Sequence, residues 1–151
     1  MDMTRFPLPM LKYLDLSKNC IIEFDISNLK NLKILNLSYN RLEEIPSNFT
    51  MLENLKELIL DSNLFITLPE ILFRLKSLSF LSLNCNEIKD LTNLIENDTL
   101  EIISLNFNRF SVIDSTILKL KKLRKLYIIS SYIIIVPEEL RKMGISVITK
   151  I

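Results

Sequence analysis

The chain has 151 residues, of which 29 are Leu and 22 are Ile, with one Gly and no Ala, His, Trp or Gln. Without His and with only two Cys, it cannot form a Ser-His-Asp or Cys-His catalytic arrangement or a zinc site of Cys and His. One glycine is too few for a phosphate-binding glycine loop, and a formal net charge of +1 selects neither nucleic acid nor membranes.

The two cysteines, Cys20 and Cys85, stand in unrelated local contexts and do not outline a disulfide scaffold. The first residues lack the apolar stretch of a signal peptide, and no window approaches the roughly 18 apolar residues of a membrane span. We therefore expect an intracellular, cytoplasmic protein that keeps its thiols reduced. The length suits a single domain covering residues 1–151.

A motif of the form LxxLxLxxNxI begins at Leu11 and returns at Leu32. Further copies, some with Ile or Phe at the apolar positions, begin at Leu55, Leu78, Leu100 and Leu123, so that successive starts are spaced 21, 23, 23, 22 and 23 residues. The sixth copy has Ser131 at the position of Asn. A fixed period in this range indicates a stacked repeat architecture.

Each repeat divides into a strand and a return segment. Within the LxLxx stretch the apolar residues alternate, which predicts a half-buried strand with Leu14 and Leu16 inward and Tyr13, Asp15 and Ser17 outward. Three return segments have apolar residues at a three-residue step, which predicts 3₁₀-like or short helical turns. These residues are Phe49, Leu52 and Leu55, then Leu72, Leu75 and Leu78, and then Ile117, Leu120 and Leu123.

An asparagine closes the strand motif in five repeats, at Asn19, Asn40, Asn63, Asn86 and Asn108. An amide side chain offers both a donor and an acceptor to a buried turn. We therefore interpret this column as a structural ladder that joins neighbouring repeats, and not as a ligand site.

The six copies resemble the leucine-rich repeat family. The resemblance implies an α/β solenoid, a right-handed β-α superhelix with a parallel sheet on its concave side and short helical, 3₁₀ or irregular segments on its convex side. Ile45-Pro46, Leu68-Pro69 and Val136-Pro137 resemble the LP-type repeats of intracellular Ras-group proteins. The shorter repeats are similar to the 22-residue type of the phosphatase 1 regulatory subunit.

The C-terminal segment departs from the motif. We expect a short helix over 138–143 that ends at Gly144, followed by a strand over 145–151. Residues 138–151 then form a degenerate seventh repeat that acts as a cap. Two alternatives stay open: the chain is a piece of a longer protein, or the apolar residues over 127–136 pack on another subunit and mediate self-association.

Function is expected at the outward strand positions that the repeat motif leaves free. Aromatic and β-branched residues are frequent there, which is typical of a protein-binding surface. The alternative is that they only support one another across neighbouring strands. The predicted partner-binding residues of the concave face are Tyr13, Ile34, Tyr39, Glu57, Ile59, Asp61, Phe80, Ile102, Phe107, Lys125, Tyr127 and Ile129. Phe80, Phe107 and Tyr127 are the expected anchors.

No catalytic residue, metal ligand or cofactor site is predicted. Glu57 and Asp61 lie four residues apart on one strand, about 13 Å, too far for an acid and base acting on one bond. The basic run from Lys119 to Lys125 is interpreted as the solvated outer face of a return segment, or else as a docking patch for an acidic partner. Nucleic acid is disfavoured because no stacking aromatics are interleaved with this run.

The sequence therefore predicts a non-catalytic intracellular scaffold that binds a partner protein. No small-molecule substrate is expected, and the resemblance implies signalling proteins as the class of partner. The alternative is the recognition domain of a larger enzyme, since related repeats occur in deadenylases, adenylate cyclases and effector ubiquitin ligases. A remnant without a dedicated partner is the third hypothesis.

Overall fold

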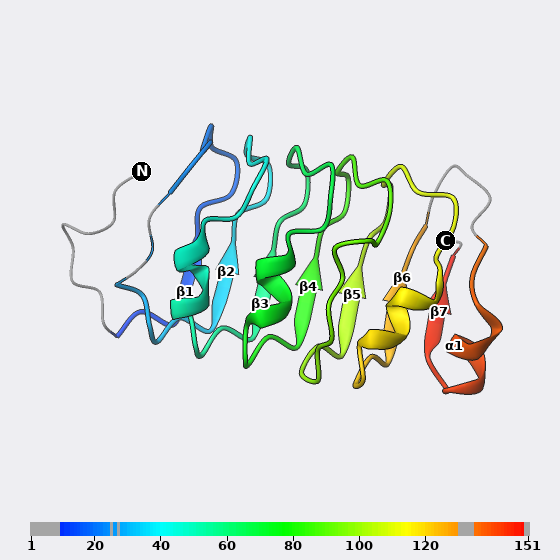
Figure 1. Ribbon diagram of the computed structural model, residues 1–151. Helices are drawn as coiled ribbons and strands as arrows, with labels where there is room; N and C mark the ends of the chain where they lie inside the picture. Colours follow the sequence, from blue (N-terminus) through cyan, green and yellow to red (C-terminus); the bar gives the residue numbers. More distant parts are fainter. Residues whose placement is uncertain (1–9, 25, 27, 130–134, 150–151) are drawn as a thin grey trace.

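The computed structural model describes residues 10–24, 26, 28–129 and 135–149. In this part of the chain, seven parallel strands pair side by side in the order in which they occur in the sequence. Figure 1 shows them in one open sheet, with short helices in the return segments in front of it. The strands are β1 (Tyr13–Asp15), β2 (Ile34–Asn36), β3 (Glu57–Ile59), β4 (Phe80–Ser82), β5 (Ile102–Ser104), β6 (Lys125–Tyr127) and β7 (Ser146–Ile148). The predicted leucine-rich repeat solenoid is confirmed.

The strands stack without a shift in register. Leu35 of β2 pairs with Leu58 of β3, and Leu58 pairs with Leu81 of β4. From β2 to β6 these middle residues are fully buried, while their neighbours on either side face outward. Each buried side chain of this size contributes about 1.5–3 kcal/mol relative to full exposure. The core is therefore a set of stacked leucine columns between the sheet and the return segments.

The return segments contain the three predicted 3₁₀ helices, η1 (Ser47–Met51), η2 (Glu70–Arg74) and η3 (Ser115–Lys119). Pro46 and Pro69 precede η1 and η2, and their carbonyls accept the first hydrogen bonds of each turn. The fifth repeat lacks this proline. Its Asp114 side chain instead accepts a 2.8 Å hydrogen bond from the Thr116 amide, so that an N-cap begins η3.

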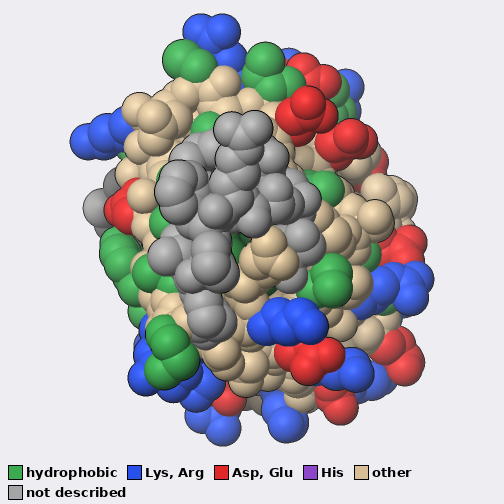
Figure 2. Space-filling model, turned by 90° about the vertical axis from the view of Figure 1, so that its left-hand side faces the viewer, with side chains coloured by type: hydrophobic (Ala, Val, Ile, Leu, Met, Phe, Trp, Pro, Cys, Tyr) green, Lys and Arg blue, Asp and Glu red, His purple; other side chains and the backbone are tan. Residues whose placement is uncertain are grey.

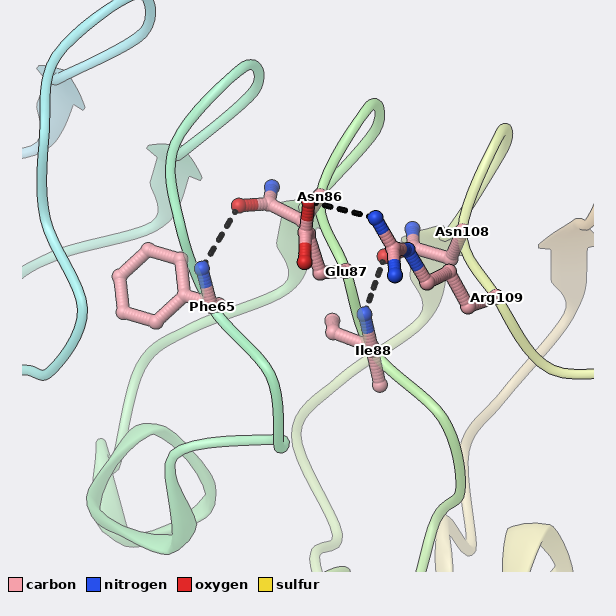
Figure 3. Close-up of polar contacts among 6 residues, drawn as sticks. All are labelled: Phe65, Asn86, Glu87, Ile88, Asn108 and Arg109. Atoms are coloured by element: carbon pink, nitrogen blue, oxygen red, sulfur yellow. Dashed lines mark hydrogen bonds and ion pairs between the residues drawn. The ribbon is translucent and has the colours of Figure 1, made fainter.

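The predicted asparagine ladder is present along the turns that follow the strands. The Asn86 side chain accepts from the Phe65 amide at 3.2 Å, and Asn108 repeats the contact with the Ile88 amide at 3.1 Å (Figure 3). Each amide nitrogen also donates to backbone carbonyls of its own and the preceding repeat. An exposed ion pair between Glu87 and Arg109, at 2.8 Å, joins the same turns. The ladder therefore links successive repeats through otherwise unpaired backbone groups.

The C-terminal segment contains the expected elements. Helix α1 (Glu138–Lys142) is followed by Gly144, whose φ of 74° lies in the left-handed region that glycine adopts readily. Strand β7 then pairs with β6 in the same parallel register as the other strands. The apolar run predicted to mediate self-association falls partly on residues 130–134, which lie outside the described residues.

Candidate functional site

The outward strand positions form one face of the sheet, which corresponds to the predicted concave side and is called the sheet face here. The turn-proximal residues Tyr39 and Phe107 lie at its rim. All twelve predicted binding residues are at least partly accessible. The exposed ones are Tyr13, Tyr39, Glu57, Phe107 and Lys125, and the half-buried ones are Ile34, Ile59, Asp61, Phe80, Ile102, Tyr127 and Ile129.

A shallow hollow of about 400 Å³ lies on the sheet face over β3 to β6, and we call it the central hollow. It brings together five of the predicted residues. These are Ile59, Asp61, Phe80, Ile102 and Tyr127, and they share the hollow with Ser82, Asn84 and Ser104. The walls are therefore apolar and aromatic, and the polar groups gather toward the end where the strands turn.

A second hollow of about 250 Å³ adjoins the first, because Phe80 and Ile102 line both. Glu57 and Glu101 contribute its carboxylates. Glu101 was not predicted as a site residue, since it precedes β5 and falls outside the three outward columns. Its carboxylate also lies 3.6 Å from the exposed Arg124 guanidinium.

A second ladder of hydrogen bonds runs across the sheet face beside the hollow. The Ser82 hydroxyl and the Asn84 backbone amide donate to Asp61 Oδ1 at 2.6 and 2.8 Å. One repeat further, the Ser104 hydroxyl and the Asn106 backbone amide donate to Asn84 Oδ1 at 2.7 and 2.9 Å. The Ile129 amide then donates to Asn106 Oδ1 at 2.7 Å. The residue two positions after β3, β4 and β5 thus binds the next repeat.

This polar ladder corrects one expectation from the sequence. Ser82 and Ser104 occupy outward positions that were expected to meet water, yet they are only 3% and 7% exposed. Their hydroxyls donate hydrogen bonds to the preceding repeat within the sheet. A signal was available in the Ser-x-Asn pattern, which occurs at Ser82-Asn84 and recurs at Ser104-Asn106.

Asp15 forms a smaller network on the first strand. Its carboxylate accepts hydrogen bonds from the Ser17 amide at 2.8 Å, from Asn36 Nδ2 at 3.1 Å and from the Tyr13 hydroxyl at 3.2 Å. Donation by the side chain and amide of Ser17, then by Asn36 and Tyr13, lowers the pKa of Asp15 below its ordinary value. The pKa of Tyr13 is raised, because its hydroxyl donates a hydrogen bond to that carboxylate and lies beside its negative charge.

The rim of the sheet face has an unusual backbone. The residue before each ladder asparagine has a positive φ between 54° and 57° although none is glycine. These residues are Lys18, Tyr39, Ser62, Cys85 and Phe107. Each donates its amide to a carbonyl of the following repeat, as Tyr39 does to Asp61 at 2.8 Å. The conformation leaves Tyr39 and Phe107 exposed, at 57% and 49%.

The basic run of the fifth and sixth repeats does not form one patch. Lys119 Nζ donates to the Leu94 carbonyl at 2.9 Å, and Lys121 lies 3.6 Å from Glu96. Lys125 stands on the sheet face, at the start of β6. Three other lysines, which the sequence analysis did not single out, precede β1, β2 and β3 and are exposed: Lys12, Lys33 and Lys56.

Figure 2 shows the end of the array at which β1 lies. Hydrophobic side chains are visible along the left-hand side of this view, where the sheet is located, and Lys and Arg side chains gather below them.

Among the described residues, no group of three or more acidic, Cys or His side chains is placed to hold a metal ion. No helix in that part of the chain is long and apolar enough to cross a membrane. Glu57 and Asp61 line different hollows. Glu57 shares its hollow with Glu101 instead.

Residues 6–146 match the family model described as "Leucine-rich repeat region". No curated protein matches the chain in sequence. Among solved structures, the leucine-rich repeat protein LIC12759 of Leptospira interrogans is 30% identical, with a TM-score of 0.74. The match covers 93% of this chain and 37% of that protein.

Two Listeria monocytogenes structures are also similar. The internalin InlF is 21% identical, with a TM-score of 0.71, over 95% of this chain and 49% of that one. The functional domain of InlJ is 25% identical, with a TM-score of 0.61, over 82% of this chain and 26% of that one. The chain thus spans half or less of each solved protein. The InlJ domain includes a cysteine ladder, whereas Cys20 and Cys85 here occupy different columns of the repeat.

Proposed function

Because the chain belongs to the leucine-rich repeat family, we propose that it is a non-catalytic module that binds a partner protein on its sheet face. The proposed binding residues are the predicted ones that line the central hollow, together with Phe107 and Tyr39 at the rim. The composition is consistent with this proposal, because it excludes the enzyme classes that need His or a glycine loop.

One observation carries the proposal. Polar groups beside the central hollow are used by the ladder from Asp61 to Asn106, whereas Phe80, Ile102 and Tyr127 remain partly accessible on short rigid strands. Apolar and aromatic side chains held in fixed positions bind a partner with little loss of conformational entropy. The alternative hypothesis, that these side chains only support one another across neighbouring strands, does not require a hollow between them.

A second candidate is that the chain is the recognition domain of a larger enzyme, such as a deadenylase, an adenylate cyclase or an effector ubiquitin ligase. The share of the solved structures that it covers, between 26% and 49%, supports a longer natural protein. The natural reading frame decides the matter: a catalytic domain in the same frame supports this candidate, and its absence contradicts it.

Two further expectations belong to the same proposal. An intracellular, cytoplasmic location is supported by Cys20 and Cys85, which are free and exposed thiols suited to a reducing compartment. Residues 138–151 act as a C-terminal cap of a single domain. That role is supported by the pairing of β7 with β6 and by the full burial of Leu140 in α1.

Affinity purification from the native cell tests the proposed binding face. The test variant carries Phe80→Ala, Phe107→Ala and Tyr127→Ala. The matched control replaces three exposed apolar residues that lie in no strand, Met51, Ile66 and Val112, by Ala. We expect one recurrent partner that wild type and control retain and the test variant loses. Equal recovery by both variants, with both folded, contradicts the proposal.

A further inference from the structure

Asp61 carries a negative charge for which the polar ladder has no need. Its carboxylate receives only neutral donors: the Ser82 hydroxyl, the Asn84 amide and Asn84 Nδ2, the last at 3.2 Å. No ion pair with Asp61 occurs within the described ranges. A half-buried carboxylate without a cation has lost part of its hydration and has gained no opposite charge in return.

The following repeats show that a neutral residue performs the same structural task. Asn84 occupies the equivalent position and accepts from Ser104 and Asn106 as Asp61 accepts from Ser82 and Asn84. Asn106 in turn accepts from the Ile129 amide. An amide oxygen is therefore sufficient for the two bonds that join the strands at Asp61 Oδ1, and the charge at position 61 serves some other purpose.

The position of that charge indicates what it binds. Asp61 lines the central hollow together with Ile59, Phe80, Ile102 and Tyr127. A carboxylate has about four acceptor sites, and the ladder uses three hydrogen bonds, two of them on Oδ1. Oδ2 thus retains capacity for a donor that approaches from the hollow.

An arginine or lysine side chain matches this combination. Its aliphatic stem packs on apolar walls, its cation is attracted to aromatic rings, and its head forms charge-assisted hydrogen bonds with a carboxylate. A free metal ion is a poor match, because the other polar lining groups are neutral. The Ser82 and Ser104 hydroxyls and the Asn84 side chain already bind one another, and the fourth group is the Tyr127 phenol. Glu57 provides a weaker case, because it is exposed and lines the second hollow and not the central one.

We infer that the central hollow receives a basic side chain, Arg or Lys, from the bound partner protein, and that Asp61 is the residue that selects it. The inference rests on the proposed function, because it names the chemistry of the partner at the same face. The occupant is a protein segment in which a basic residue stands next to an apolar one.

The test uses a library of random dodecapeptides selected on the immobilised chain. We expect the enriched peptides to carry Arg or Lys, and to lose binding when Phe80→Ala is introduced. The dissociation constant of the best peptide is then measured on wild type, on Asp61→Asn and on Asp98→Asn. Asp98 is an exposed acid away from the sheet face and serves as the control.

Asp61→Asn is expected to weaken binding about tenfold or more, while Asp98→Asn leaves it unchanged. Replacing the peptide arginine by neutral citrulline should weaken binding to wild type equally and leave binding to Asp61→Asn nearly unaffected. Enrichment of Phe80-dependent peptides without a basic residue overturns the inference, as does full affinity of the best peptide for Asp61→Asn. Either result leaves the proposed function standing. If no enriched peptide depends on Phe80, the result contradicts both the inference and the proposed function. If Asp61→Asn fails to fold, the premise that the ladder needs no charge is overturned.

Discussion

The hydroxyl of Ser82 donates a 2.6 Å hydrogen bond to the carboxylate of Asp61, across two neighbouring strands of the sheet face. Ser104 repeats the contact on Asn84 at 2.7 Å. These bonds join neighbouring strands of the face that is proposed to bind a partner. The polar groups therefore hold this surface in place, while the apolar side chains remain available to contact the partner.

Two substitutions at Asp61 separate its structural acceptor role from its charge. Asp61→Ala removes the acceptor of Ser82 and of the Asn84 amide, and we expect a loss of about 1–3 kcal/mol in the free energy of unfolding. Asp61→Asn keeps an oxygen in place and should change it by less than about 0.5 kcal/mol. Urea unfolding followed by circular dichroism measures both. Equal losses for the two variants contradict the interpretation.

Asn63→Ala tests the turn ladder. Asn63 is 5% exposed. Its side-chain oxygen accepts from the Leu42 backbone amide at 3.0 Å, and its side-chain nitrogen donates to the Leu37 and Leu60 carbonyls at 3.0 and 3.1 Å. Its loss strands these buried groups, so we expect about 1–3 kcal/mol of destabilisation. Asn93→Ala, at an exposed position, is the control and should have little effect. An unchanged urea midpoint for Asn63→Ala refutes the ladder role.

Acidification tests the network on β1. The pKa of Asp15 in the folded protein lies below its ordinary value of 3.8, so the folded state binds this proton less tightly than the unfolded chain. The resulting contribution to stability is complete above the unfolded pKa and is lost as the pH falls through the folded pKa. An NMR titration should give a midpoint below 3.8, which Ser17→Ala moves upward because the hydroxyl donor is removed. A midpoint at or above 3.8 in the wild type contradicts the network.

The two exposed thiols allow the binding face to be blocked selectively. Cys85 adjoins Asn84, which lines the central hollow, whereas Cys20 belongs to the first repeat and lines a separate surface. A bulky maleimide on Cys85, in a Cys20→Ser background, should abolish capture of the partner. The same label on Cys20, in a Cys85→Ser background, should leave capture intact, and equal effects of the two labels place the interface elsewhere.

The sequence predicted the parts of the fold that depend on local spacing. Alternation around Leu35 and Leu58 identified the strands, the three-residue apolar step predicted η1 to η3, and the asparagine column predicted the turn ladder. These features repeat with a single period, so each copy supports the same interpretation. The pairing of successive strands without a shift then follows from stacking of equivalent positions.

The candidate site was predicted less completely, because it depends on contacts between repeats. Alternation within β4 puts Ser82 at an outward position, but it does not indicate that Ser82 is buried and bonded to the carboxylate of Asp61 one strand away. Glu101 lies outside the strand columns and joins Phe80 only through the shape of the surface. A comparison of polar residues along each column, from one repeat to the next, provides the missing signal.

Methyl NMR of the isoleucine side chains, with and without the captured partner, tests the central claim most directly. Ile59 and Ile102 line the central hollow, whereas Ile66 is 51% exposed outside the strands. We predict that the signals of Ile59 and Ile102 shift or broaden on binding and that the signal of Ile66 does not. Unchanged signals from Ile59 and Ile102 in the saturated complex would contradict the assignment of the sheet face as the binding surface.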